Sequence, residues 1–114
     1  MKYVTAIFKP SRLDAVLDAV TAAGASGVTV TEVRGYGRQQ GKTEVYRGAE
    51  YEIRLLPKVR IEVATTDDTV ERIVDAIVAA ANTNKIGDGK IFVMDLESVL
   101  RIRTGEKNEG ALTS

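Results

Sequence analysis

The segment VRIEVATTDDTVERIVDAIVAAA, residues 59–81, changes its hydrophobic period midway and therefore predicts a strand followed by a helix. In residues 59–64, apolar and charged side chains alternate, as in a strand with one buried face. Between Val70 and Ala81 the apolar residues recur three and four positions apart, which is the spacing of one helical face. Asp67 and Asp68 precede this helix, where carboxylates stabilise an N-terminus.

The N-terminal part of the chain repeats the same pattern. Residues 3–8 form a short segment rich in β-branched and aromatic side chains, and the segment ends before Pro10, as a strand would. A helix is predicted to begin at Ser11, with Asp14 three positions later completing a capping box. Its apolar residues keep the helical spacing until Gly24 ends it.

Two further strands complete the order of elements. Residues 28–33 and 91–96 are both rich in apolar and β-branched side chains. The resulting order, β-α-β-β-α-β, predicts an α+β ferredoxin-like fold, with a four-stranded antiparallel sheet and two helices on one face. We expect residues 1–114 to form a single domain, because the chain is too short for two ordinary ones.

The sheet face without helices is the next point to explain. The strands at 3–8 and 91–96 carry apolar side chains on both faces, including Phe92 and Met94 on one of them. A face this apolar would be costly to leave in water. We therefore expect a homo-oligomer, although an apolar monomer surface is the simpler alternative.

The composition excludes several classes of function. The chain has no cysteine and no histidine, which excludes disulfides, thiolate catalysis, Ser-His-Asp triads and imidazole metal ligands. The 16 basic and 16 acidic residues balance, so no net field attracts nucleic acid. No apolar run approaches the roughly 20 residues of a membrane span. We expect a soluble cytoplasmic protein.

Residues 37–56 form an unusually long connection between the second and third strands. A hairpin usually needs about two to five residues, whereas this stretch has roughly twenty. It contains many charged residues and two tyrosines, Tyr46 and Tyr51, and no helical or strand period organises its first half. Long loops of this kind are functional or disordered.

The connection at residues 82–90 has the composition of an anion-binding loop. Gly87 and Gly89 flank Asp88, and Lys90 follows at once. Glycines let backbone amides approach an anion closely, and cationic side chains neutralise it. Arg101 and Arg103 would share one side of the chain if that segment were extended. The sequence predicts a polyphosphate site here, with an ordinary turn as the alternative for the glycines alone.

With these motifs in view, the chain resembles the PII nitrogen-regulatory signal proteins over nearly its full length. The resemblance implies a ferredoxin-like homotrimer with a regulatory loop at 37–56, a nucleotide-binding loop at 82–90 and a C-terminal loop at 101–107. The remaining residues, 108–114, have the composition of a polar tail, which we expect to be frayed. It rests on residues 29–33, 35–39, 46–51, 56–59, 85–93 and 101–106.

The resemblance implies that ATP or ADP binds in clefts between neighbouring subunits. The phosphates would meet the glycine-rich loop and the two C-terminal arginines, and other residues would line the nucleoside or the base of the long loop. Asp88 is expected to contribute its backbone rather than its carboxylate. The implied nucleotide-binding residues are Thr29, Gly37, Arg38, Gln39, Glu62, Ala64, Gly87, Asp88, Gly89, Lys90, Arg101, Ile102 and Arg103.

The resemblance further implies a second ligand, 2-oxoglutarate, bound beside Gln39, Lys58 and Gly87. Gln39 would also hold Mg²⁺ together with the ATP phosphates and the 2-oxoglutarate. A divalent cation is chemically reasonable there, because it would bridge two anions that otherwise repel each other. The alternative for Lys58 is a plain charge at the edge of a strand.

The long loop is implied to carry the output. Tyr51 matches the position that a nucleotidylyltransferase modifies with UMP or AMP, and Arg47 would contact a partner. The implied partners are an ammonium transporter, which would also bring the protein to the membrane, the nucleotidylyltransferase and other nitrogen-assimilation regulators. Asn84 stands where the family more often has glycine, and we expect it to adopt the left-handed backbone that the turn needs. Without the resemblance, Tyr51 is a loop anchor and Arg47 a solvated charge.

Three other functions compete with this interpretation. An RNA-binding module has the same order of elements, but residues 59–64 lack the aromatic side chains on which bases stack. A small enzyme would have to work without histidine or cysteine, and no positioned nucleophile is evident, so we expect no enzymatic activity. A PII-like paralogue that senses a different metabolite is the closest alternative.

Overall fold

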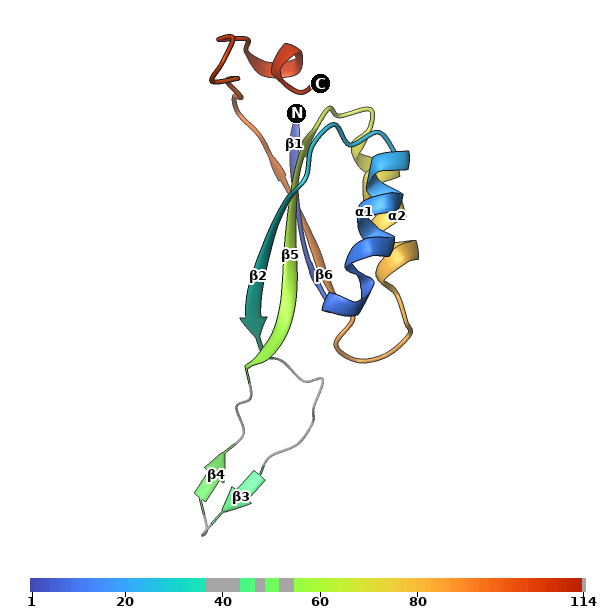
Figure 1. Ribbon diagram of the computed structural model, residues 1–114, viewed down its shortest axis with the longest axis vertical. Helices are drawn as coiled ribbons and strands as arrows, with labels where there is room; N and C mark the ends of the chain where they lie inside the picture. Colours follow the sequence, from blue (N-terminus) through green and yellow to red (C-terminus); the bar gives the residue numbers. More distant parts are fainter. Residues whose placement is uncertain (37–43, 47–48, 52–54, 114) are drawn as a thin grey trace.

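The computed structural model describes residues 1–36, 44–46, 49–51 and 55–113, and describes residues 44–46 and 49–51 by their backbone. These described residues contain a four-stranded sheet, two helices covering one of its faces, and a separate two-stranded hairpin (Figure 1). The elements in order are β1 (Lys2–Phe8), the 3-10 turn η1 (Pro10–Arg12), α1 (Leu13–Ala22), β2 (Thr29–Gly35), β3 (Glu44–Tyr46), β4 (Ala49–Tyr51), β5 (Leu56–Thr65), α2 (Val70–Ala81), β6 (Gly89–Asp95) and the 3-10 turn η2 (Asn108–Ala111).

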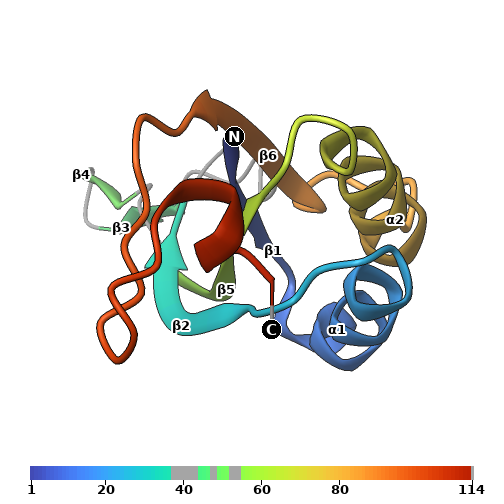
Figure 2. The same cartoon turned by 90° about the horizontal axis from the view of Figure 1, so that it is seen from above.

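The predicted ferredoxin-like fold is confirmed. The main sheet has the strand order β2-β5-β1-β6, and every neighbouring pair is antiparallel. Val4 of β1 lies opposite Val63 of β5 on one side and Val93 of β6 on the other. Both helices lie against the same face of the sheet, as the view from above shows (Figure 2).

The core lies between this face and the helices. It contains the residues that the strand and helix periods place inward, and Phe8, Ile61, Ile73 and Ile77 are among its largest side chains. The remaining members are Val4, Ala6, Val16, Val20, Val59, Val63 and Ala81. Alternate residues of β1 and β5 therefore pack in the core. The residues between them point to the opposite face of the sheet, which no helix of the described residues covers and which we call the open face.

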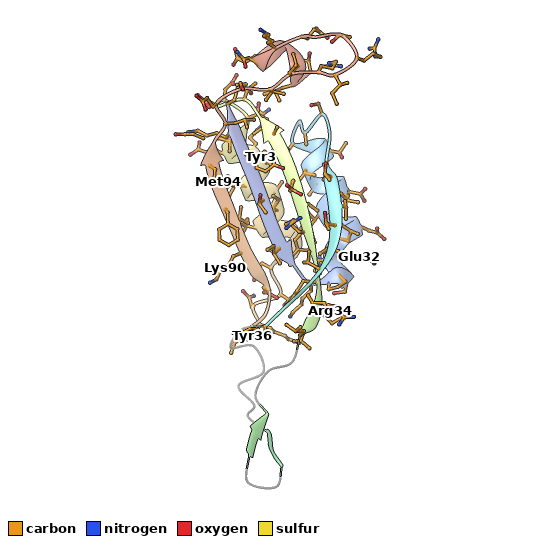
Figure 3. The ribbon with its side chains drawn as sticks, turned by 90° about the vertical axis from the view of Figure 1, so that its left-hand side faces the viewer. Tyr3, Glu32, Arg34, Tyr36, Lys90 and Met94 are labelled. Carbon is orange, nitrogen blue, oxygen red and sulfur yellow. The ribbon has the colours of Figure 1, made fainter. Side chains whose placement is uncertain are left out.

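The open face combines apolar and charged side chains. Phe92 and Met94 of β6 are 47% and 50% exposed there. Figure 3 views the sheet from this side, with Tyr3 and Met94 toward one end and Lys90 toward the other. Exposure of such large side chains agrees with the expected oligomer, and the homotrimer itself stays a prediction.

The structure corrects two local predictions. Ser11 does not begin the first helix but lies in η1, and α1 starts at Leu13 with no side-chain hydrogen bond from its N-cap residue, Arg12. The capping box is therefore wrong: Arg12 Nε instead donates to the carbonyl of Ala80, 2.8 Å away, and ties this turn to α2. Part of the long connection is also regular, since β3 and β4 pair as a hairpin.

The strand β5 is longer than predicted. It begins at Leu56 rather than at Val59, because residues 56–58 pair with the end of β2. The last residue of the predicted 37–56 loop thus belongs to the sheet. Within the part of the chain that the structure describes, no helix has the length and apolarity that crossing a membrane requires.

Candidate functional site

The glycine-rich connection leads from α2 into β6 and turns by unusual backbone conformations. Asn84, Gly87 and Gly89 have φ angles of 60°, 97° and 111°. The expectation that Asn84 adopts a left-handed backbone is confirmed. At Gly89 a side chain would also collide with β1, because an added Cβ would lie 1.9 Å from the carbonyl oxygen of Ile7. Gly89 is therefore required by the close approach of two strands, whatever else it binds.

The carboxylate of Asp88 points back into its own loop. It accepts hydrogen bonds from the backbone N–H of Thr83 at 2.7 Å, from the Thr83 hydroxyl and from the backbone N–H of Lys85 at 3.3 Å. Lys9 Nζ, which follows β1, lies 3.2 Å away. These hydrogen bonds, those from Thr83 above all, hold the pKa of the Asp88 carboxyl well below its usual range.

Lys58 reaches the same loop from β5. Its side chain is buried, with 8% of the residue exposed, and its Nζ donates to the carbonyl oxygen of Gly87 at 2.8 Å. Burial lowers the pKa of the Lys58 ammonium, and the positive charge of Lys9 lowers it further. The structure thus brings two predicted ligand residues, Lys58 and Gly87, into contact. Lys90, three positions after Gly87, lies on the open face of the sheet (Figure 3).

Lys9 is a residue of this site that the sequence did not single out. The feature of the sequence that could have identified Lys9 is its position directly after the first strand. Because β1 and β6 are antiparallel, the end of β1 lies beside the start of β6. We call this end of the sheet, with Phe8, Gly35, Leu56 and Gly89, the loop end. Tyr36 lies there too, at the base of the long connection (Figure 3).

Thr29, Glu62 and Ala64 lie toward the opposite end of the sheet, which we call the terminal end and which contains Lys2, Thr65 and Asp95. Thr29 of β2 faces Glu62 of β5, and Ala64 faces Tyr3 of β1. The Tyr3 hydroxyl donates a hydrogen bond to the Glu62 carboxylate, which raises the pKa of Tyr3. Tyr3 is a second residue of this region that the sequence did not single out.

The segment with Arg101 and Arg103 also lies beyond the terminal end, and it is not extended. The backbone N–H of Arg101 donates to Glu106 and that of Gly105 donates to Arg101, each at 2.8 Å, which closes a tight turn. The interpretation that extension puts both guanidinium groups on one side is therefore wrong. Ile102 at its tip is 98% exposed.

The tail is not frayed up to residue 113, because Arg101 holds it. Its Nη2 donates to the carbonyl oxygens of Gly110, at 3.5 Å, Ala111, at 3.2 Å, and Thr113. Residues 108–111 form the 3-10 turn η2. The tail has no periodic apolar residues with which to pack, and hydrogen bonds from one guanidinium group hold it in place instead.

The predicted nucleotide residues thus fall into two groups. Gly87, Asp88, Gly89 and Lys90 lie at the loop end, whereas the groups around Glu62 and Arg101 lie at the terminal end (Figure 1). The seven residues of β6 separate these ends by roughly 20 Å, at about 3.3 Å per residue. One chain does not bring the two groups together.

Several predicted residues lie outside the described part of the chain. These are Gly37, Arg38 and Gln39, which come after β2 in the sequence, and Arg47, which comes between β3 and β4 in the sequence. Tyr51 is the last residue of β4.

Comparison with known proteins agrees with the geometry. The model of the family described as Nitrogen regulatory protein P-II matches residues 1–106. The chain is 56% identical to Nitrogen regulatory protein P-II of Pasteurella multocida and 55% identical to Nitrogen regulatory protein GlnK of Escherichia coli K12. Each similarity extends over 112 residues, which are 98% of this chain and 100% of the relative. The resemblance seen in the sequence is confirmed, and the chain belongs to the nitrogen regulatory protein P-II family.

Proposed function

We propose that the protein is a homotrimeric sensor that binds ATP or ADP and, with MgATP, 2-oxoglutarate, and that it regulates nitrogen-assimilation proteins through residues 37–56. The observation that carries this proposal is the separation of the two site groups. A cyclic assembly joins different surfaces of neighbouring chains. Such a contact would bring the loop end of one chain against the terminal end of the next and complete each nucleotide site.

The charges at the loop end support an anionic ligand. Lys58 contacts Gly87, Lys9 contacts Asp88, and Lys90 directly follows Gly89 in the chain. Burial and the charge of Lys9 both disfavour the charged form of Lys58. A phosphate or carboxylate nearby would restore a favourable environment for that ammonium. Gly87 and Lys58 together would hold one carboxylate of 2-oxoglutarate, and Gln39 would help to hold the magnesium ion. The nucleotide is a signal in this scheme and no reaction is needed.

The output is a shift in the populations of the long loop. ADP lacks the γ-phosphate that positions Mg²⁺, so it would leave the loop in a different set of conformations. The loop would be read by an ammonium transporter, by a nucleotidylyltransferase and by other regulators or enzymes of nitrogen assimilation, contacted in part through Arg47. The protein would work in the cytoplasm and meet the membrane only through the transporter.

Reciprocal binding tests the sensor. Calorimetry should show that saturating MgATP strengthens 2-oxoglutarate binding by at least about tenfold, and that 2-oxoglutarate strengthens MgATP by the same factor, since linkage requires equality. ADP should give no such gain. Affinity for 2-oxoglutarate that is indifferent to MgATP would reject the scheme, and Arg72→Ala, an exposed change on α2, should leave both affinities unchanged.

Modification of Tyr51 has a direct readout. Intact mass should show one nucleotidyl group per chain in protein from nitrogen-limited cells and none after ammonium is supplied. The added phosphate would place a bulky anion in the hairpin and block partner contact. The variant Tyr51→Phe should keep the unmodified mass in both conditions, and a shift that survives this substitution would assign the modification elsewhere.

A further inference from the structure

Two lysines, one directly after β1 and one in β5, hold adjacent residues of the glycine-rich loop. Lys9, directly after β1, contacts the carboxylate of Asp88 at 3.2 Å, and Lys58 of β5 donates to the carbonyl of Gly87 at 2.8 Å. Lys9 Nζ also lies 3.5 Å from the Thr83 hydroxyl. The loop is therefore fixed from outside as well as by its own hydrogen bonds.

Asp88 is the centre of this arrangement. One of its carboxylate oxygens accepts from the backbone N–H groups of Thr83 and Lys85, and the other accepts from the Thr83 hydroxyl and faces Lys9. Only 20% of its side chain is exposed. Both oxygens are thus engaged inside the protein and neither is directed to a ligand.

A carboxylate beside a bound polyphosphate should repel it. If the Asp88 charge acted only through that repulsion, its removal would tighten nucleotide binding. If the carboxylate instead fixes the turn that contains Gly87 and Gly89, its removal would weaken binding, because the turn would lose its preorganised shape. The two roles predict opposite signs.

We propose that Asp88 is a positioning residue whose carboxylate fixes the 83–89 turn for anion binding, and that Lys9 neutralises this carboxylate and anchors the turn to the end of β1. This inference rests on the proposed nucleotide site. Lys9 converts what would be a repulsive charge into an internal ion pair. Neither side chain touches the nucleotide itself.

The arrangement also reaches the 2-oxoglutarate side. The Asp88 charge favours the protonated ammonium of Lys58, whereas Lys9 disfavours it. Without the Asp88 carboxylate, the positive charges of Lys9 and Lys58 would repel each other with no anion between them to offset the repulsion. The same carboxylate therefore supports both the turn and the cation expected to hold a dicarboxylate.

The test is a double-mutant cycle on the full-length protein. The variants are Asp88→Asn, which keeps the size but not the charge, Lys9→Met, which keeps the length of the side chain, and the double variant. Binding of MgATP and of inorganic tripolyphosphate is measured by calorimetry. Each single variant should weaken both ligands about tenfold, and the double variant should be no weaker than Asp88→Asn, because the ion pair that Lys9→Met removes is already lost in Asp88→Asn.

Amide hydrogen exchange supplies a readout that does not depend on any ligand. The N–H groups of Thr83 and Lys85 should be protected in the free protein and should exchange at least about tenfold faster in Asp88→Asn. The control is Asp75→Asn, which removes an exposed carboxylate on α2 and should change neither exchange nor binding.

The outcomes are separable. Unchanged or tighter MgATP binding by Asp88→Asn overturns the positioning role. A wild-type protein that fails to bind MgATP, but shows the predicted exchange difference, rejects the nucleotide site and keeps the role in the turn. If Asp88→Asn does not fold, Lys9→Met decides alone, and an unchanged affinity in that variant overturns the proposal.

Discussion

Replacing Phe92 with aspartate should dissociate the protein into single 12.3 kDa chains and abolish ATP binding. Phe92 lies on the open face beside Met94, and the two side chains are 47% and 50% exposed in one chain. An oligomer that buries this face would have to bury an aspartate at every contact, at a cost of several kcal/mol each. Since the two groups of predicted nucleotide residues lie at opposite ends of one chain, dissociation would leave every proposed site incomplete.

Light scattering during gel filtration measures this directly. The wild type should have about three times the chain mass, and Phe92→Asp should have the mass of one chain. Val78→Asp is the matched control, because Val78 is also 47% exposed but lies on α2, in the helical layer. A Phe92→Asp protein that stays trimeric and binds ATP would show that the open face is not the subunit contact.

Gly89→Ala should destabilise the fold by several kcal/mol. The new Cβ would lie 1.9 Å from the Ile7 carbonyl oxygen and 2.9 Å from the Phe8 Cα, both backbone atoms that no rotamer change can move. Residue 89 would also be forced to keep a φ of 111°, which L residues rarely adopt. Steric overlap and backbone strain each cost on the order of 1–3 kcal/mol, and relief of both requires separating β1 from β6.

Two other glycines separate these contributions. Gly105 has a φ of 74° but no atom within 4 Å of an added Cβ, so Gly105→Ala should cost only about 1 kcal/mol of strain. Gly27 has neither a neighbour nor a positive φ, and Gly27→Ala should stay within about 0.5 kcal/mol of the wild type. Urea unfolding of the three variants should rank them in this order. A mild effect at Gly89 would mean that β6 shifts away from β1 easily.

The sheet and helices could be predicted because their signal is local. Alternation in β1 and β5 and the stripe of α2 depend on neighbouring positions alone. The first three residues of β5 lack that signal, since Leu56, Pro57 and Lys58 do not alternate. They become strand because Pro57 pairs opposite Arg34 of β2, which is a tertiary contact that no short window contains.

The site was predictable in kind rather than in detail. Glycines, lysines and arginines pointed to both groups of the proposed nucleotide site, but the arrangement of Arg101 required knowledge of where the tail carbonyls lie. The role of the Asp88 carboxylate was equally invisible, since its contact with Lys9 joins distant parts of the chain. A polar side chain takes its partner from the fold, and its sequence neighbours do not reveal that partner.

The opposite placement of the two half-sites has a genetic consequence. Consider one allele that has lost the lysine at position 90 and another that has lost the arginine at position 103, each inactive when expressed alone. Coexpressed in one cell, the two variant chains would assemble into mixed rings. At one junction of such a ring, the intact loop end of one chain would meet the intact terminal end of its neighbour. Complementation between two null alleles would then restore part of the signal, and a heterozygous ring would respond at a single position rather than at three.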